Sequence, residues 1–185
     1  MAVKEVKLST IEEVLTTLTT AEFNDALKRN RSAFLFRGLP NVSYKLTTSL
    51  RWNCKGKAGE LEPSILRNFS KYAASTSPLN SCWEQMVIGQ HHGLPTRLMD
   101  WTYSPLAALH FATSGEDITG MNQHDAVVWA IDITEMNTLL PAKYQKVLND
   151  ERAYLFTIDM LDRVAKDLTT YDNDMGEDGI VLLEP

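Results

Sequence analysis

Polar and reactive side chains crowd residues 90–113, which lie between two apolar segments. A hydrophobic core does not require such crowding. Gly93 and Pro95 break a helical pattern, and residues 96–102 are predicted to follow as a short extended segment. A second helix is predicted to begin at Ser104, because Ser is a favourable N-cap and the Pro after it suits the first turn. The junction between a strand end and a helix start is typical of sites that hold small polar ligands, especially phosphates.

Three arginines are candidates for binding an anion. Arg37 is expected at the exit of a strand, where the adjacent Gly38 relieves crowding and the guanidinium could hold a phosphate or carboxylate with two hydrogen bonds. The structural alternative is an ion pair that ties this strand to a neighbouring loop. Arg51 and Arg97 could complete an anion site, although Arg97 is equally well placed to pair with Asp100.

The same segment contains a carboxylate, a hydroxyl and two imidazoles. Alternation along an extended chain puts Asp100 and Thr102 on one face. Thr102 then presents its hydroxyl on the same side as Asp100, which could hold Arg97 or serve only as a helix cap. On a helix His91 and His92 point about a third of a turn apart, which disfavours a shared metal ion. These histidines either lock the turn that follows or contact a substrate, and His91 is the better candidate for contact.

The chain resembles the FRG domain family in three ordered blocks, namely Phe36-Arg37-Gly38, residues 44–51 and residues 90–102. Its order of an aromatic-Arg-Gly strand, a strand ending in hydroxyl residues and a late strand ending in Glu is also similar, more distantly, to ADP-ribosyltransferases. That resemblance implies that Arg37 binds the phosphates or ribose of NAD and that Thr102 orients the ribose. The candidate cofactor-binding residues are Arg37, Gly38, Arg51, His91, Arg97 and Asp100.

Glu184 is the candidate for a catalytic carboxylate. Cleavage of the nicotinamide glycosidic bond passes through an oxocarbenium-like state, which a nearby carboxylate stabilises. Transferases of this type place the Glu at or just beyond a late strand, but a strand-terminal Glu before Pro is also commonplace. FRG domains are expected to continue with an Arg- and Gln-containing block that nothing here matches, so we expect either a truncated C-terminus or a site completed by other residues. The catalytic candidates are Arg37, Thr102 and Glu184.

Two classes of function follow. The first is an NAD-dependent ADP-ribosyltransferase, which uses NAD as substrate and acts as a bacterial toxin or phage-defence effector on nucleic acid or protein, with an antitoxin or phage protein as a further partner. The second is a non-catalytic FRG module that binds an anionic or nucleotide ligand. A carboxylate that converges with Arg37 on one cleft would distinguish them. A serine or cysteine hydrolase is disfavoured, because no G-x-S-x-G elbow or base-paired cysteine is visible.

Composition sets outer limits on these functions. The 185 residues are 44% hydrophobic and 23% charged, which is ordinary globular composition. A net charge of −6 argues against a large nucleic-acid footprint, although it leaves room for a local basic site. Cys54 and Cys82 form neither a metal spacing nor a disulfide framework, and no metal is expected. The absence of a membrane span or signal peptide in the sequence makes the cytoplasm the expected compartment.

The predicted architecture is α+β, with helices packed on a small mixed or antiparallel sheet that resembles that of ADP-ribosyltransferases. Residues 1–32 are expected to form a helical segment, with Ser9 and Glu12 as a capping box, and residues 33–185 the FRG domain. Residues 39–57 are predicted as a loop that contains at most one short turn, and residues 171–178 as a solvated loop. Strands are predicted at 34–37, 96–101, 126–133 and 179–184, and helices at 11–18, 21–29, 60–74, 81–92, from 104 onward and at 141–148.

Overall fold

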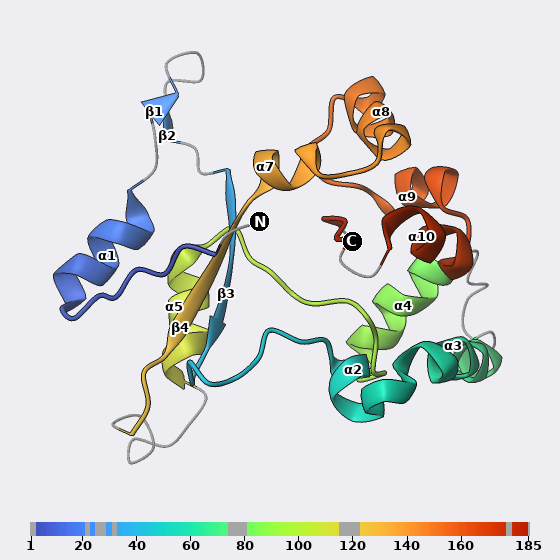
Figure 1. The fold of residues 1–185 in the computed structure, drawn as a ribbon, viewed down its shortest axis with the longest axis horizontal. Helices are drawn as coiled ribbons and strands as arrows, with labels where there is room; N and C mark the ends of the chain where they lie inside the picture. Colours follow the sequence, from blue (N-terminus) through green and yellow to red (C-terminus); the bar gives the residue numbers. More distant parts are fainter. Residues whose placement is uncertain are drawn as a thin grey trace. The chain divides into compact units, whose positions relative to one another are not determined.

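A computed structural model describes residues 3–20, 23–24, 29–30, 33–73, 81–114, 123–176 and 179–184 of the chain (Figure 1). The chain divides into two compact units, each made from two separate stretches of sequence. Unit 1 contains residues 1–44 and 101–131, and unit 2 contains residues 45–100 and 132–185. The chain therefore passes from one unit to the other three times, after residues 44, 100 and 131.

Unit 1 begins with helix α1 (Ile11–Thr19), which has a reciprocal N-terminal cap. The Thr10 hydroxyl accepts a hydrogen bond from the Glu13 backbone, and the Glu13 side chain accepts one from the Thr10 backbone. This capping box lies one residue later than predicted. The helix predicted at 21–29 is wrong where the structure describes it, because β1 (Phe23–Asn24) and β2 (Arg29–Asn30) form an antiparallel pair there.

A strand pair and one helix form the rest of unit 1. Strand β3 (Phe34–Leu39) pairs with β4 (Val127–Asp132), and the two run in opposite directions (Figure 1). Helix α5 (Pro105–Ser114) packs on β3. The approach is very close at Gly38, where a Cβ atom would lie 1.8 Å from the carbonyl oxygen of Ala108. Only glycine fits at this position, so Gly38 sets the spacing between strand and helix.

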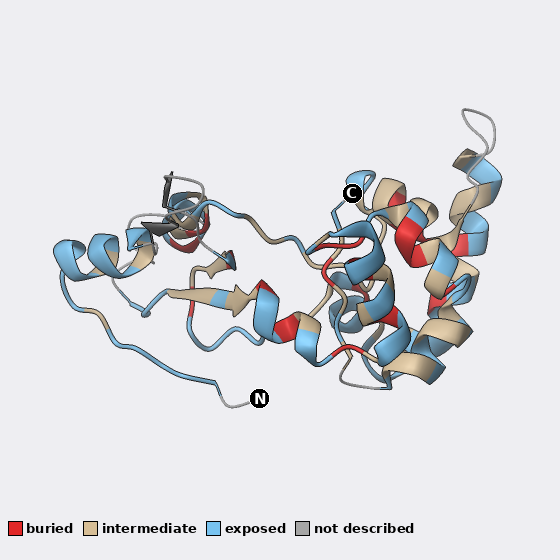
Figure 2. Ribbon diagram, turned by 90° about the horizontal axis from the view of Figure 1, so that it is seen from above, coloured by how far each residue is buried: buried red, intermediate tan, exposed pale blue. Residues whose placement is uncertain are grey.

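Unit 2 is helical, and it encloses the larger hydrophobic core. The Trp83 side chain lies within this core and donates a hydrogen bond to the Ala165 carbonyl at 2.7 Å. Tyr144 and Phe156 pack edge to face, with ring centroids 5.9 Å apart. Buried residues are red in Figure 2. The elements of the unit are α2 (Ser49–Cys54), the 3-10 turn η1 (Lys55–Lys57), α3 (Ala58–Ala73), α4 (Cys82–His91), α7 (Ile133–Thr138), α8 (Ala142–Glu151), α9 (Ile158–Val164) and α10 (Leu168–Met175).

The α+β class is confirmed, but the sheet is smaller than predicted. Residues 96–101 are not a strand, and only the next residue, Thr102, forms an isolated bridge, to Phe36. Residues 179–184 are likewise not a strand, and Leu183 forms an isolated parallel bridge to Phe156.

The loop predicted at 39–57 is wrong from Ser49 onward, because α2 and η1 occupy that part. The loop predicted at 171–178 is wrong up to Met175, because α10 runs to that residue, whereas 177–178 lie outside the described residues. The Asp167 side chain caps this helix by accepting a hydrogen bond from the Thr170 backbone at 2.7 Å. Among the described residues, no helix combines the length and the apolarity needed to cross a membrane.

Candidate functional site

The turn after α4 is built as a glycine-dependent helix end. The Leu94 N–H donates to the Gly89 carbonyl at 2.8 Å, and the Gly93 N–H donates to the Gln90 carbonyl at 2.9 Å. This pair of bonds is the Schellman arrangement, which requires a left-handed residue just past the helix. Gly93 supplies it with a φ of 80°. The polar segment 90–113 thus begins with a tight turn whose conformation is fixed by these two hydrogen bonds.

A hydrogen-bonded network follows this turn and joins two of the sequence blocks. The Gln90 amide donates to Asp100 at 2.6 Å, while its carbonyl oxygen accepts from the Thr96 hydroxyl at 2.6 Å. Thr96 is 1% exposed, and its backbone N–H donates to the Ser49 hydroxyl at 3.1 Å. The Thr96 carbonyl in turn accepts from the Leu50 N–H at 3.1 Å. These polar residues therefore brace the segment against α2.

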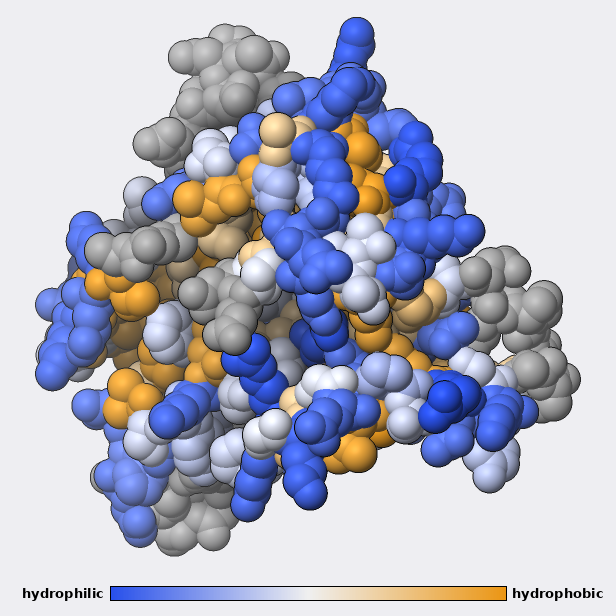
Figure 3. Space-filling view, turned by 45° about the vertical axis from the view of Figure 1, so that its right-hand side comes forward, coloured by the Kyte–Doolittle hydropathy of each residue, from blue (hydrophilic) through white to orange (hydrophobic). Residues whose placement is uncertain are grey.

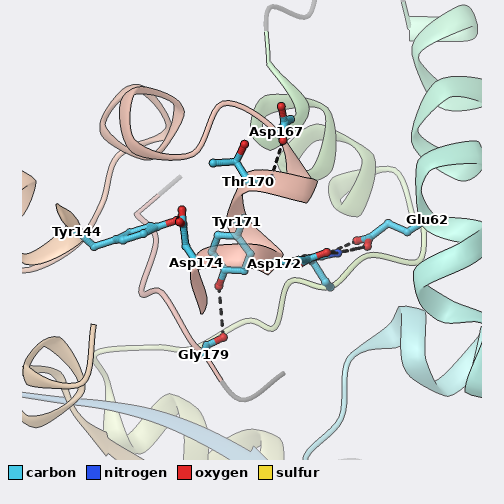
Figure 4. Close-up of polar contacts among 9 residues, drawn as sticks. Glu62, Tyr144, Asp167, Thr170, Tyr171, Asp172, Asp174 and Gly179 are labelled. Atoms are coloured by element: carbon cyan, nitrogen blue, oxygen red, sulfur yellow. Dashed lines mark hydrogen bonds and ion pairs between the residues drawn. The ribbon is translucent and has the colours of Figure 1, made fainter. Parts of the chain in front are cut away.

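Arg97 is held by two carboxylates that lie far away in the sequence. They belong to Glu62 and Asp172, which are labelled in Figure 4. Its Nε donates to Glu62 Oε1 at 2.8 Å, and Nη1 donates to Asp172 Oδ1 at 2.5 Å. Burial disfavours the charge of Arg97, but the hydrogen bonds and charges of Glu62 and Asp172 outweigh it and raise the pKa of the guanidinium above its usual value. The sequence suggested Asp100 as the partner. Arg97 instead ties the segment to α3 and α10, with its guanidinium over the ring of Tyr171.

The side chains of Arg37 and Thr102 point to opposite faces of the two paired segments, strand β3 and the chain at Thr102. Thr102 exchanges two backbone hydrogen bonds with Phe36, of 2.8 and 2.9 Å, so these two residues stand directly opposite each other. Directly opposed residues share a face, and the next residue along a strand points to the other one. The face of Phe36 and Gly38 is the one packed on α5. The expected cleft shared by Arg37 and Thr102 does not arise from this pairing.

The Thr102 hydroxyl also takes part in starting the next helix. It accepts a hydrogen bond from the Ser104 N–H at 3.0 Å, and the Ser104 hydroxyl accepts one from the Ala107 N–H at 3.2 Å. This confirms the predicted start of α5, with Ser104 as N-cap and Pro105 in the first turn. The ribose-orienting role of Thr102 stays a prediction.

Glu184 is exposed and lines a cavity of about 550 Å³ in unit 2. Its backbone N–H donates to the Phe156 carbonyl at 2.7 Å, which fixes the chain where the side chain emerges. Three further carboxylates line the same cavity, and none of its described lining residues is Lys or Arg. A site of this charge suits a cationic group. The lining residues are Ser81, Glu84, Thr157, Ile158, Asp159, Asp162 and Glu184.

The remaining candidates lie in different environments. Arg51 is exposed near the end of α2, and His91 is exposed in the last turn of α4. Gly38 has a packing role against α5, as described above. Unit 2 contains Arg51, His91, Arg97, Asp100 and Glu184, whereas unit 1 contains Arg37, Gly38 and Thr102. Neither unit alone collects the full set, and the ligand-binding roles stay predictions.

The environment of Cys82 makes this residue a poor candidate for a nucleophile. Burial, together with the negative charge of Asp162, raises the pKa of the Cys82 thiol to about 11. A thiol with such a pKa is protonated at neutral pH and is a poor nucleophile. In the part of the chain that the structure describes, no group of three His, Cys, Asp or Glu side chains is placed to hold a metal ion.

Sequence reasoning missed three residues that shape this region, namely Ser49, Glu62 and Asp172. Ser49 lies within the second sequence block, so its position was a usable signal. Glu62 is 2% exposed, and nothing in its neighbourhood in the sequence marks it as the partner of Arg97. Asp172 lies 75 residues beyond Arg97, in the segment predicted as a loop.

Comparison with known proteins supports the resemblance of the sequence blocks. The model of the FRG domain matches residues 32–119, which contain all three of the sequence blocks that resemble this family. The match covers slightly less than half of the chain and takes in parts of both units. No curated protein and no solved structure matches the chain.

Proposed function

We propose that this FRG domain binds an anionic, nucleotide-like ligand and that Arg37 anchors it. The observation that carries the proposal is the placement of Arg37 on β3. Because Gly38 lies against the backbone of α5, the strand is held rigidly, and alternation puts Arg37 on the face that α5 does not cover. A guanidinium on a rigid element is preorganised for two-pronged binding of a phosphate or carboxylate.

The other arginine of the late block has a different task. Arg97 already holds the carboxylates of Glu62 and Asp172, which neutralise its charge. Binding of an anion there would require one of these ion pairs to break. Arg97 is therefore a structural residue. The proposal rests on the position of Arg37 on β3, and Arg37 also has an interaction within the protein.

Calorimetric titration with NAD, ADP-ribose and inorganic phosphate tests this function. We expect the wild-type chain to bind at least one of the two nucleotides, and we expect Arg37→Ala to lose that binding. Arg37→Lys should also lose most of the affinity, because an ammonium cannot reproduce the paired hydrogen bonds of a guanidinium. Arg163→Ala is a matched control, since Arg163 is an exposed arginine paired with Glu151.

The thermal melt of each variant shows whether it is folded. A wild-type chain that binds neither nucleotide, or a folded Arg37→Ala variant that binds with unchanged affinity, would contradict the proposal.

The accessible carboxylate of Glu184 favours a second candidate, NAD-dependent ADP-ribosyl transfer. In this case Glu184 stabilises the cationic ribosyl group as the bond to nicotinamide breaks, and the acidic cavity favours that positive charge. The ribosyl carbon then bonds to a nucleophile of the acceptor or to water, and release of nicotinamide from NAD measures the reaction. Glu184→Gln should abolish the release while it retains NAD binding, whereas Asp159→Asn, on the same cavity, should retain both. Binding of NAD without release in the wild-type chain would leave only the binding module.

A further inference from the structure

Basic and aromatic side chains combine on the surface of α2 and η1. Residues 45–59 contain four Lys or Arg residues and no Asp or Glu, although the whole chain has a net charge of −6. Within this stretch Arg51, Lys55 and Lys57 are exposed. Trp52 is 73% exposed. We call the surface formed by Arg51, Trp52, Lys55 and Lys57 the α2–η1 surface.

Folding does not account for the exposure of Trp52. Helix α2 is anchored by Leu50, which is 3% exposed and whose N–H donates to the Thr96 carbonyl. Its N-terminus is capped by the Thr48 hydroxyl, which accepts from the Arg51 N–H. Trp52 lies two residues after Leu50, on the opposite side of a helix with 3.6 residues per turn. The side chain is thus directed into solvent by a helix that is already held in place without it.

The two kinds of side chain suit one type of ligand. An exposed indole offers a flat face on which an unpaired base can stack, and stacking is possible with every base. Guanidinium and ammonium groups beside it can contact the phosphates that flank such a base. A double-stranded nucleic acid keeps its bases stacked on one another, so it does not offer a base face to Trp52.

We propose that the α2–η1 surface binds single-stranded nucleic acid, with a base stacked on Trp52 and phosphates held by Arg51, Lys55 and Lys57. The basic stretch is short, so it suits a nucleic-acid segment of only a few nucleotides. The acidic charge of the rest of the chain confines binding to this surface. Arg51 thereby acquires a ligand different from the one expected from the sequence. The inference does not depend on Arg37 or Glu184, and so it is independent of the proposed function.

An anionic membrane is the main competing partner, because Trp and Lys also occur together at membrane surfaces. Membrane adsorption by a helix needs an apolar face several residues wide. In α2 the apolar Leu50 points into the protein, and Trp52 is flanked by the polar residues Arg51 and Asn53. On the face drawn in Figure 3, apolar side chains (orange) are interspersed with hydrophilic ones (blue). A single exposed indole surrounded by polar groups is better suited to stacking on a base than to insertion of an apolar helix face into a membrane.

Fluorescence anisotropy of short labelled oligothymidylate and oligouridylate, titrated with the full chain, tests the proposal. We expect binding of at least one strand that weakens as salt rises and exceeds binding of a duplex of the same length. Trp52→Ala should reduce the affinity about tenfold or more. The double variant Lys55→Gln, Lys57→Gln should reduce both the affinity and its dependence on salt.

Phe111→Ala is the matched control, because it removes another aromatic side chain that is exposed, at 64%, and lies outside the basic surface. Its affinity should equal that of the wild-type chain. Unchanged affinity in a folded Trp52→Ala variant would overturn the proposal, as would absence of binding to both single strands. If the chain binds phosphatidylserine-containing vesicles in a Trp52-dependent way but binds no single strand, the partner of this surface is a membrane and the proposal is wrong.

Discussion

The Nε atom of Arg97 lies 2.8 Å from Oε1 and 3.0 Å from Oε2 of Glu62, a carboxylate that is almost fully buried in α3. On its other side the same guanidinium reaches Asp172 in α10. One arginine of the FRG sequence block therefore connects three separate parts of unit 2. A charge held in this way is a structural feature whose loss can be measured as stability.

Removal of Arg97 should destabilise the protein strongly. Arg97→Ala leaves the buried carboxylate of Glu62 without a counter-charge, and we expect a loss of about 3 kcal/mol in the free energy of unfolding. Arg163→Ala removes an exposed partner of Glu151 and should cost less than about 1 kcal/mol. Urea denaturation compares the two. The double variant Arg97→Met, Glu62→Leu should recover much of the loss, and a double variant as unstable as Arg97→Ala would contradict this account.

The hydroxyl of Thr96 should contribute through its hydrogen bonds alone. Thr96→Val keeps the shape of this buried side chain but deletes the donor to Gln90. The carbonyl oxygen of Gln90 then loses a partner, and we expect a cost of about 1–2 kcal/mol in the free energy of unfolding. Thr113→Val, an exposed position in α5, should change stability by less than about 0.5 kcal/mol. Chemical denaturation of both variants gives the comparison, and equal midpoints would refute the prediction.

Replacement of Gly93 by a residue with a side chain should strain the backbone dihedral angles without causing a steric clash. The φ of Gly93 is 80°, and no heavy atom lies within 4 Å of the place where a Cβ would stand. Gly93→Ala should therefore cost about 1 kcal/mol through backbone conformation alone. Gly56 has equally open surroundings but no such positive φ, so Gly56→Ala should be nearly neutral. Thermal melts of the two variants that coincide would show that Gly93 is not the residue that fixes the turn.

Reactivity of Cys82 should be low at neutral pH and should rise on alkalinisation. The pKa of its thiol is raised to about 11, so the reactive thiolate is scarce near pH 8 and increases tenfold for each pH unit up to that value. In a Cys54→Ser variant, the initial rate of alkylation by iodoacetamide reports Cys82 alone. A rate that has already levelled off near pH 8.5, the usual value for a free thiol, would contradict the raised pKa.

Local sequence patterns correctly predicted those elements that are stabilised by interactions between residues close in the sequence. Ser104 and Pro105 predicted the start of α5, and the apolar run that begins at Phe34 predicted β3. Gly93 and Pro95 predicted the break of the helical pattern, and the structure ends α4 there with Gly93 in the left-handed conformation. In each case the deciding interaction lies within a few residues of the signal.

Errors occurred where distant parts of the chain decide the structure. Residues 96–101 have the alternation of a strand, but the Thr96 backbone forms hydrogen bonds with Ser49 and Leu50 in α2 in place of a sheet ladder. The segment 179–184 belongs to unit 2 and is apolar because Val181 and Leu183 pack against the core of that unit, and it contributes only one bridge. The separation of Arg37 from Thr102 likewise follows from the register with Phe36, which spacing alone does not specify.

The division of unit 1 between two stretches of sequence has a consequence for the covalent chain. Strand β3 belongs to residues 1–44, whereas helix α5, which packs on it at Gly38, belongs to residues 101–131. A cut between residues 44 and 45 would leave this packing surface shared by two separate polypeptides. The fragments 1–44 and 45–185 should then reassemble by complementation, with Gly38 as the residue on which their recognition depends.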